Sequence, residues 1–344
     1  MHPRFTEILC CPATGSELEL ITNESFANGM VRTGILATKD GAAHYPIING
    51  IPRFVSKEFY SSSFGFEWRK WPRVQFESEN VGRPMEGHTT RMFKAITRLA
   101  EGDVRGRTIV EFGCGPGRFL DVIRIWGGVA VGIDLSLAVE SARENFRDDA
   151  DVLIVQGDIL HPPFKKDIFD FGYTIGVLHH TPDPATGIKA LANVVKPKGK
   201  ISCCVYSKLG FYNYPSVYLF RKITSALERG FGNGFSTKCA LAYSYFAAYV
   251  LYYCFQLVKI IPLLGSKAVT LIETYLLVNL SLPDIRWRIL DVFDAITPRY
   301  ASTHTPEEMR EWFAAAGCTQ LQQTNWGDTS FVAVKDDNDA IAKY

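Results

Sequence analysis

Short apolar runs alternate with stretches of helical periodicity between residues 107 and 206. This rhythm is typical of βαβ units, in which buried parallel strands form nearly continuous hydrophobic segments. It predicts an α/β fold with a parallel sheet and helices on both of its faces. The predicted strands are Thr108–Phe112, Val129–Asp134, Val152–Gln156, Phe169–Ile175 and Lys200–Tyr206.

A capped helix and a hairpin are predicted near the end of the chain. Thr305 and Glu308 form a predicted capping box, and Gly317 ends the helix that this box begins. Two further apolar runs, Thr319–Thr324 and Phe331–Lys335, predict an antiparallel hairpin that closes the sheet.

Changes in the pattern divide the rest of the chain. Short strand-like pieces with turns between them come first, followed by a mixture of aromatic and charged residues at helical spacing. A Tyr- and Leu-rich stretch later interrupts the α/β rhythm. The expected domains are a β module at 1–56, a helical cover at 57–100, the α/β core at 101–207, a helical insertion at 208–296, and a C-terminal helix and hairpin at 297–344.

Charge and composition narrow the range of functions that the chain could have. With 37 basic and 36 acidic residues, the chain has a formal net charge of +1. A nucleic-acid partner calls for a broad positive surface, so this balance argues against one. The first residues lack the basic and then apolar pattern of a secretory signal, so we expect a cytoplasmic protein.

The first predicted strand continues into a glycine-rich turn. It ends at Glu111-Phe112, and the turn reads Gly113-Cys114-Gly115-Pro116-Gly117. A ligand can approach the main chain of such a turn closely because few side chains cover it. A nicotinamide or flavin site spaces its glycines as G-x-G-x-x-G, whereas here the third glycine comes one residue early. The turn therefore indicates a ligand without a pyrophosphate.

Acidic residues follow the next two strands. Asp134 lies nineteen residues after Gly115, and we expect it to accept hydrogen bonds from two ribose hydroxyls. We expect Asp158 to take the amino group of adenine while Ile159 packs against the ring. Three strand ends then converge on one nucleoside.

At these residues the sequence resembles the class I S-adenosylmethionine-dependent methyltransferases, whose motifs match 111–117, 134 and 156–159 in order and spacing. The likeness continues through 169–170 and 176–184, in a form like that of small-molecule and quinone-type methyltransferases. The family implies a Rossmann-like seven-stranded sheet whose last strand is antiparallel, with S-adenosylmethionine as cofactor and S-adenosylhomocysteine as product. Cofactor contacts are expected from Glu111, Gly113, Cys114, Gly115, Gly117, Asp134, Leu135, Asp158, Ile159 and Gly176.

Two histidines follow the fourth predicted strand. Methyl transfer from a sulfonium is an in-line displacement, so alignment in a dry site supplies most of the acceleration. An oxygen nucleophile still becomes more reactive when its proton leaves. His179 is the best-placed general base in the sequence, with His180 as its substitute. The alternative is that both imidazoles only pack around the turn before Pro182.

An acceptor site is expected from the helical cover and from the stretch 293–304. A cation over an aromatic face gains about 0.5–2 kcal/mol, and recognition groups often lie on loops such as the one we expect beside the final helix. The predicted acceptor residues are Phe64, Trp68, Trp71, Arg299, Tyr300 and His304. The alternative is that the aromatic residues belong to the core and that 293–304 is an irregular connection.

The first segment resembles a zinc-ribbon-like module that some methyltransferases carry or recruit. Only Cys11 is left of the four expected thiols, because Thr14, Thr38 and Gly41 stand at the other positions. One sulfur cannot complete a tetrahedral site, so we predict a module that holds no metal and has a structural or regulatory role.

The insertion contains an unusual apolar run. Residues 239–258 are 20 uncharged residues, five of them tyrosines, between Lys238 and Lys259. The run is long enough to cross a bilayer, but its tyrosines suit a buried or interfacial helix better. We expect a lid over the acceptor site or a homodimer face, and contact with a membrane surface through 239–282 is the alternative. Either preferred interpretation implies an apolar or aromatic acceptor.

The sequence thus predicts an enzyme that methylates a small acceptor, with oxygen ahead of carbon and nitrogen as the acceptor atom. Two alternatives stay open: a cofactor-binding, non-catalytic partner subunit of another methyltransferase, and a tRNA or protein methyltransferase. The lack of an Asn/Asp-Pro-Pro-Tyr/Phe motif after the fourth strand weighs against the latter.

Overall fold

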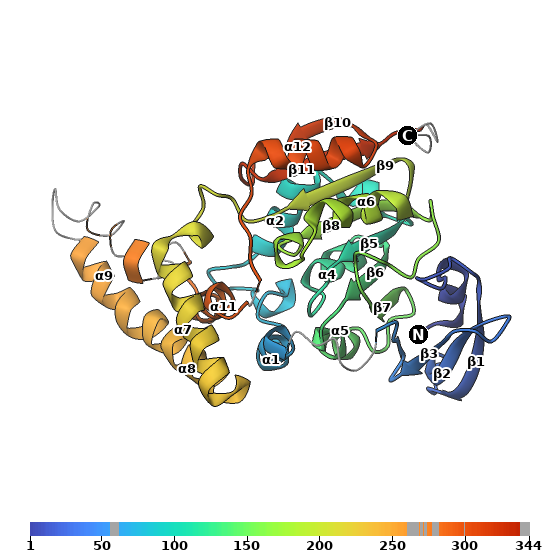
Figure 1. Ribbon diagram of the computed structural model, residues 1–344, viewed down its shortest axis with the longest axis horizontal. Helices are drawn as coiled ribbons and strands as arrows, with labels where there is room; N and C mark the ends of the chain where they lie inside the picture. The colour runs from blue at the N-terminus through green and yellow to red at the C-terminus, as the bar shows by residue number, and fades with distance from the viewer. Residues whose placement is uncertain are drawn as a thin grey trace.

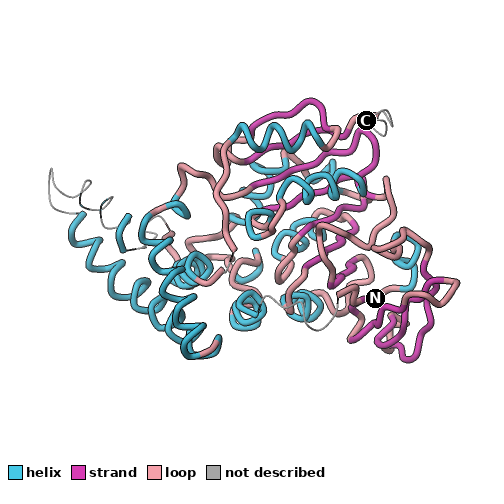
Figure 2. The backbone as a smooth tube through the Cα atoms, viewed as in Figure 1, coloured by secondary structure: helices cyan, strands magenta, loops and turns pink. Residues whose placement is uncertain are grey.

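The structure is a computed structural model that describes residues 1–55, 62–259, 268, 271, 274–276, 282–298 and 300–337, without the side chains of 62–65. A seven-stranded sheet occupies the centre of the molecule (Figure 1). A four-stranded sheet lies on one side of it, and a helical arm projects from the opposite side (Figure 2).

The central sheet has the strand order β10-β11-β9-β8-β5-β6-β7. Its strands are β5 (Thr108–Phe112), β6 (Val129–Asp134), β7 (Val152–Gln156), β8 (Phe169–Ile175), β9 (Val195–Cys204), β10 (Cys318–Gln323) and β11 (Ser330–Lys335). Strands β5 to β9 pair in parallel, whereas β11 is antiparallel to both β9 and β10. The predicted Rossmann-like sheet with an antiparallel last strand is therefore confirmed.

Alternate side chains of the parallel strands enter two different cores, as the two-residue period of a strand requires. Ile109 and Ala130 face one core, while Val110 and Val131 face the other. The first core is covered by α2 (His88–Thr97), α3 (Glu101–Val104), α4 (Arg118–Ile125) and α5 (Ala138–Asn145). The second is covered by α6 (Pro184–Val194), α12 (Pro306–Ala315) and the N-terminal module.

The N-terminal module is a small antiparallel sheet that attaches to the edge of the central one. Its elements are η1 (Pro3–Ile8), β1 (Leu18–Ser25), β2 (Val31–Thr38), β3 (His44–Ile48) and β4 (Ile51–Pro52). The N–H of Phe54 donates to the carbonyl of Gln156 at 2.8 Å, and Arg53 donates to the side chain of Gln156 at 2.7 Å. Arg53 also pairs with Glu140 of α5. The module thereby covers the exposed edge of β7.

No group of three or more His, Cys, Asp or Glu side chains is placed to hold a metal ion in the ranges that the structure describes. Cys11 instead lies 3.0 Å from the hydroxyl of Tyr45 within the small sheet. The metal content of this module stays a prediction.

The helical arm has a core of its own, separate from the two cores of the sheet. It consists of α1 (Ser62–Lys70), α7 (Pro215–Phe231), α8 (Asn233–Phe246), the π-helical turn η5 (Ala247–Leu251), α9 (Tyr252–Lys259) and α11 (Ile285–Ile296). Within the described residues, one helix, Asn233–Lys259, is long and apolar enough to cross a membrane by length and composition. In Figure 1, α1 and α11 lie on the side of the arm that faces the sheet.

Two local expectations were wrong. Residues 293–296 form the last turn of α11 rather than a loop, because Phe293 and Ile296 are buried on the same side of an amphipathic helix. Strand β9 begins five residues before Lys200, since a register shift against β8 lets the strand continue through the turn at 196–199. The capping box of Thr305 and Glu308 at the start of α12 is confirmed.

Candidate active site

The turn between β5 and α4 is tight because its three glycines adopt positive φ, of +77° at Gly113, +52° at Gly115 and +92° at Gly117. A Cβ atom on Gly113 would lie 2.4 Å from the side chain of Val177, so this position excludes a larger residue by packing as well. Gly115 is more open, and its nearest neighbour would be the ring of Trp68 at 3.5 Å. Gly115 and Trp68 both line the cavity that opens beside the turn.

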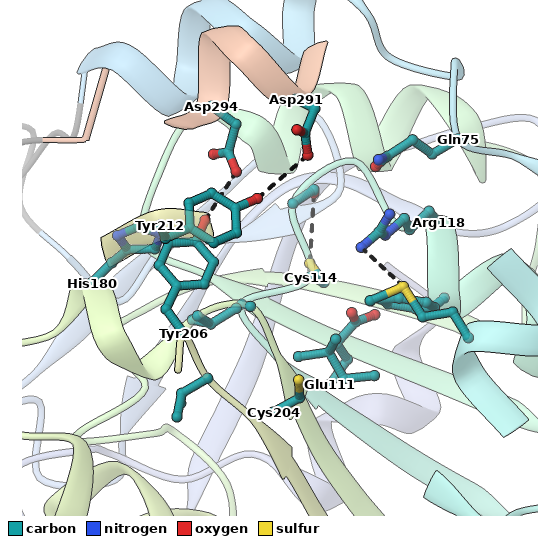
Figure 3. Close-up of a pocket in the computed structure, with 18 of the residues that line it drawn as sticks. Gln75, Glu111, Cys114, Arg118, His180, Cys204, Tyr206, Tyr212, Asp291 and Asp294 are labelled. Atoms are coloured by element: carbon teal, nitrogen blue, oxygen red, sulfur yellow. Dashed lines mark hydrogen bonds between the residues drawn. The ribbon is translucent and has the colours of Figure 1, made fainter. Parts of the chain in front are cut away.

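A cavity of about 690 Å³ opens beside this turn, at the carboxyl ends of the parallel strands (Figure 3). Its volume lies in the range of sites that hold a cofactor or small molecule. The cofactor motifs contribute Glu111, Gly113, Cys114, Gly115, Asp134, Leu135, Asp158, Ile159 and Gly176. The opposite wall includes Glu67, Trp68, His180, Tyr206, Tyr212, Asp291 and Asp294. Of the predicted cofactor residues, Gly117 alone does not line the cavity; it is the N-cap of α4, and a Cβ atom there would lie 2.6 Å from the ring of Phe146.

Asp134 ends β6 next to the glycine turn. The N–H of Gly115 donates to its Oδ2 at 2.9 Å, and the N–H and hydroxyl of Ser136 donate to its Oδ1 at 2.8 and 2.7 Å. Burial raises the pKa of Asp134, although these hydrogen bonds oppose the shift. A carboxylate offers about four acceptor positions, so one stays open and a second opens when the Ser136 hydroxyl rotates away. This arrangement suits the two hydroxyls of a ribose.

Asp158 lies two residues beyond Gln156, the strand neighbour of Asp134. Its Oδ1 accepts the N–H of Leu160 at 2.9 Å, and its Oδ2 lies 3.0 Å from Nδ1 of His161. Ile159 is buried and lines the cavity together with Leu160. An apolar surface beside a carboxylate matches a purine ring with an exocyclic amino group.

Two charged residues line the cavity near the glycine turn. Glu111 is buried and accepts the hydroxyl of Tyr173 at 3.1 Å, and burial raises its pKa well above the ordinary value. Arg118, the first residue of α4, contacts the sulfur of Met92 at 3.9 Å (Figure 3). Arg118 makes no ion pair with any residue in the described part of the chain. Its guanidinium therefore has donors left for an anionic group of a ligand.

His179 lies behind the cavity wall rather than in it. It is 1% exposed, it does not line the cavity, and its ring stacks on Tyr206 with centroids 3.5 Å apart. Its Nδ1 accepts the N–H of Tyr206 at 3.3 Å, and burial lowers its pKa well below the ordinary value. A neutral, stacked His179 is placed to support Tyr206, and its position argues against contact with an acceptor.

His180 lines the cavity, and its protonation can be assigned. Its Nδ1 lies 2.7 Å from the carbonyl oxygen of Tyr300, which can only accept, so Nδ1 carries the proton. In the neutral ring Nε2 is then the basic nitrogen. Burial lowers the pKa of His180, which favours this neutral form.

Two parallel tyrosine rings form part of the wall next to His180 (Figure 3). Tyr206 follows β9, and Tyr212 lies in the short turn η4 (Phe211–Asn213). Their centroids are 3.5 Å apart and their planes differ by 5°. The hydroxyl of Tyr206 donates to Asp294 at 3.1 Å, and that of Tyr212 donates to Asp291 at 3.4 Å. Both hydroxyls are thereby fixed by carboxylates of α11.

The predicted acceptor residues are dispersed. Trp68 lines the cavity. Those that do not line it are Trp71, which packs against Phe293 in the arm, Tyr300, which is 75% exposed, and His304, which packs against Trp312. Arg299 and the side chain of Phe64 lie outside the described residues.

Sequence reasoning missed much of the wall. The residues it did not single out are Glu67, Arg118, Tyr206, Tyr212 and Asp291. Arg118 could have been identified from the sequence, because it directly follows the glycine turn. The sequence gives a weaker indication for Asp291 and Asp294, because a spacing of three residues places both on one face of a helix. Nothing in the sequence distinguishes Glu67 from an ordinary glutamate of a solvated helix.

Strand order, glycine turn and cavity together define a Rossmann-like domain with a nucleoside site at its strand ends. Residues 110–203 match a family model described as a methyltransferase domain. The central domain is thus a class I S-adenosylmethionine-dependent methyltransferase domain, as the motifs predicted, and its cofactor is S-adenosylmethionine.

Curated relatives match about a third of this chain. A demethylmenaquinone methyltransferase of Lactococcus lactis is 33% identical over 119 residues, which cover 33% of this chain and 47% of that protein. A ubiquinone biosynthesis O-methyltransferase of Alkalilimnicola ehrlichii is 30% identical over 122 residues, which cover 35% of this chain and 47% of that protein. The chain therefore spans about half the length of these relatives.

Among solved structures, an S-adenosylmethionine-dependent methyltransferase of Mesorhizobium loti is 25% identical with a TM-score of 0.32. The match covers 40% of this chain and 59% of that one.

Proposed function

We propose that this chain is an S-adenosylmethionine-dependent methyltransferase that acts on a small apolar or aromatic acceptor, and that the acceptor atom is oxygen. One observation carries the proposal: a single cavity joins the cofactor motifs to a wall of stacked tyrosines and an imidazole. The curated relatives include one named as an O-methyltransferase, which supports oxygen as the acceptor atom.

The residues of one half of the cavity fit the cofactor. Asp134 would take the ribose hydroxyls, and Asp158 with Ile159 would hold the adenine. The donors of Arg118 would meet the α-carboxylate of the methionine part. The cofactor supplies an electrophilic methyl group on a positively charged sulfur.

The other half suits a planar acceptor with a hydroxyl group. Tyr206 and Tyr212 offer aromatic surface, and His180 offers a basic Nε2. In the proposed reaction the hydroxyl proton passes to Nε2 of His180, while the acceptor oxygen forms the new bond to the methyl group. The electron pair of the broken carbon–sulfur bond stays on sulfur. Because alignment supplies most of the acceleration, holding the ring matters more than the strength of the base.

Mass spectrometry tests the proposal. The purified protein is incubated with S-adenosylmethionine bearing a deuterated methyl group and with a panel of phenols, hydroquinones and matched thiols and amines. We expect a deuterated methyl group on the oxygen of a phenol or hydroquinone, together with an equal amount of S-adenosylhomocysteine. Transfer to nitrogen or sulfur alone would overturn the choice of atom. Tight cofactor binding without transfer to any acceptor would favour a non-catalytic partner subunit.

We also propose that the arm rests on an anionic membrane surface, where an apolar acceptor would partition. Residues 208–283 contain seven lysines and arginines and two glutamates, a net of +5 in a chain whose total is +1. Its exposed apolar residues include Tyr218, Leu219, Phe231, Phe235, Tyr245, Phe246, Tyr249, Tyr253 and Leu257. Aromatic side chains among exposed lysines are typical of helices that lie in a membrane interface.

Vesicle flotation distinguishes the possible roles of the arm. We expect the protein to float with vesicles containing a third phosphatidylglycerol and to stay behind with purely phosphatidylcholine vesicles. Equal failure with both vesicles, combined with a dimeric mass in solution, would instead identify the arm as a homodimer face.

A further inference from the structure

Glu67 is a buried carboxyl group without a partner. It lies on α1, it is 0% exposed, and it lines the cavity. Neither of its carboxylate oxygens has a hydrogen-bond partner among the described residues. A buried, unpaired carboxylate is strongly unfavourable, so this group either keeps its proton or meets a cation.

The neighbours of Glu67 make the wall acidic. Asp291 and Asp294 project from α11, and Figure 3 shows both beside the two tyrosines. Burial first, and then Asp294 and Asp291, raise the pKa of Glu67 well above its ordinary value, while Arg118 of α4 opposes the shift. The carboxyl therefore holds its proton at a pH where an exposed glutamate has lost it.

The backbone fixes this wall opposite the glycine turn. Trp68, the next residue, lies 3.5 Å from the Cβ position of Gly115. The carbonyl of Trp68 accepts the hydroxyl of Ser141 at 2.9 Å, which ties α1 to α5. With the nucleoside at Asp134 and Asp158, the sulfur and amino-acid part of the cofactor would occupy the remainder of the same cavity, which Glu67 lines.

We propose that Glu67, with Asp291 and Asp294, forms the receptor for the positive sulfonium of S-adenosylmethionine, and that Glu67 releases its proton when this cofactor binds. S-adenosylhomocysteine has lost the sulfonium charge, so the same wall discriminates against the product. The proposal rests on the cofactor of the proposed function and is independent of the acceptor. It assigns Glu67 to cofactor charge recognition, and its expected effect is on binding rather than on the chemical step.

Calorimetry tests the proposal on the purified chain. Each cofactor is titrated at pH 7 in phosphate and in Tris, whose different ionisation enthalpies reveal protons released on binding. Wild-type protein should release protons with S-adenosylmethionine and not with S-adenosylhomocysteine. In Glu67→Gln the release should disappear, and S-adenosylmethionine should bind about tenfold or more weakly, because the charge–charge attraction between the carboxylate and the sulfonium is lost. The affinity of Glu67→Gln for S-adenosylhomocysteine should change less than about twofold, because this product has no sulfonium charge for Glu67 to attract.

Two further variants provide a control and a second test of the same wall. Glu311→Gln, at an exposed position of α12, should match wild type in every titration. Asp294→Asn tests the same wall if Glu67→Gln melts before it can be titrated, and it should also weaken S-adenosylmethionine selectively. Equal weakening of both cofactors, or unchanged affinity and proton release, would overturn the proposal. A wild-type protein that binds neither cofactor would contradict the proposed function instead.

Discussion

The two halves of the cavity are built differently. The cofactor half comes from the ends of neighbouring strands, where the register places Phe112 opposite Ile133 and Asp134 opposite Gln156. The opposite half, which holds the proposed sulfonium receptor and the aromatic acceptor wall, comes from helices α1 and α11 and from the segment after β9. Glu67 and Asp294 therefore come together across more than two hundred residues of sequence. One half is set by the backbone of the sheet, and the other by the packing of helices against it.

This difference predicts how the two halves respond to change. A substitution at a strand end should alter affinity for both S-adenosylmethionine and S-adenosylhomocysteine, because both contain the same nucleoside. A substitution in the helical wall should instead separate the two cofactors or change turnover of the acceptor. Such loops and covers on a rigid sheet are where specificity usually resides.

The largest effect is expected at His180. His180→Ala should lower kcat by about 10²- to 10⁴-fold with little change in cofactor affinity, because a general base is lost. Burial lowers the pKa of His180 below its ordinary 6.5, so the basic form is present above that lowered pKa. The wild-type kcat should fall only as the pH drops through this lowered pKa. The kcat of His180→Ala should not show this fall at acid pH. His44→Ala, at an exposed position of β3, is the control; an unchanged rate in His180→Ala would remove this base from the mechanism.

A glycine pair tests the rigid half. Gly113→Ala combines a positive φ, which costs roughly 1–2 kcal/mol, with overpacking against Val177, which costs roughly 1–3 kcal/mol. Gly106→Ala also has a positive φ, but its Cβ would meet nothing within 4 Å, so only the first cost applies. Urea unfolding should show the larger loss for Gly113→Ala, together with loss of cofactor binding. Equal losses in the two variants would mean that the turn tolerates a side chain.

Asp134→Ala should weaken binding of both cofactors by about 10- to 150-fold, the value of hydrogen bonds to a charged group. The matched control Asp148→Ala removes a carboxylate that is 82% exposed. Isothermal titration measures both. Asp134→Ala should thus affect both cofactors equally, whereas Glu67→Gln should weaken S-adenosylmethionine selectively. If Asp134→Ala weakened the binding of S-adenosylmethionine alone, the proposed division of the cavity into two halves would be contradicted.

The smallest effect concerns the arm. Lys238→Gln and Lys259→Gln should each weaken binding to anionic vesicles by about 1 kcal/mol, the contribution of one basic residue near such a surface. Turnover of a water-soluble acceptor should not change, since neither lysine lines the cavity. Vesicle binding that is insensitive to both changes would argue against electrostatic attachment.

The sheet and its cofactor residues were predictable because their signals are local. The runs 108–112 and 129–134 are apolar segments that end in an acid or a glycine turn, and each is a strand with the predicted bounds. Asp134 could be assigned because a parallel sheet brings successive carboxyl ends to one edge.

The acceptor wall could not be predicted because it depends on tertiary packing. The turn η3 (Leu178–His180) directs His180 into the cavity and His179 behind it, a difference of one residue that no periodicity reveals. Tyr300 lies on an irregular segment but is mostly exposed, and its contribution is the carbonyl that binds His180. Asp291 and Asp294 share a helix face, but the sequence does not say that this face meets α1.

A crystal structure of the protein with S-adenosylmethionine would show whether the cofactor spans both halves of the cavity as proposed. We expect the ribose on Asp134, the adenine beside Ile159, and the methyl group directed toward Tyr206 with the sulfonium near Glu67. A cofactor bound in the reverse orientation, or with its methyl group directed away from the wall formed by α1 and α11, would contradict it.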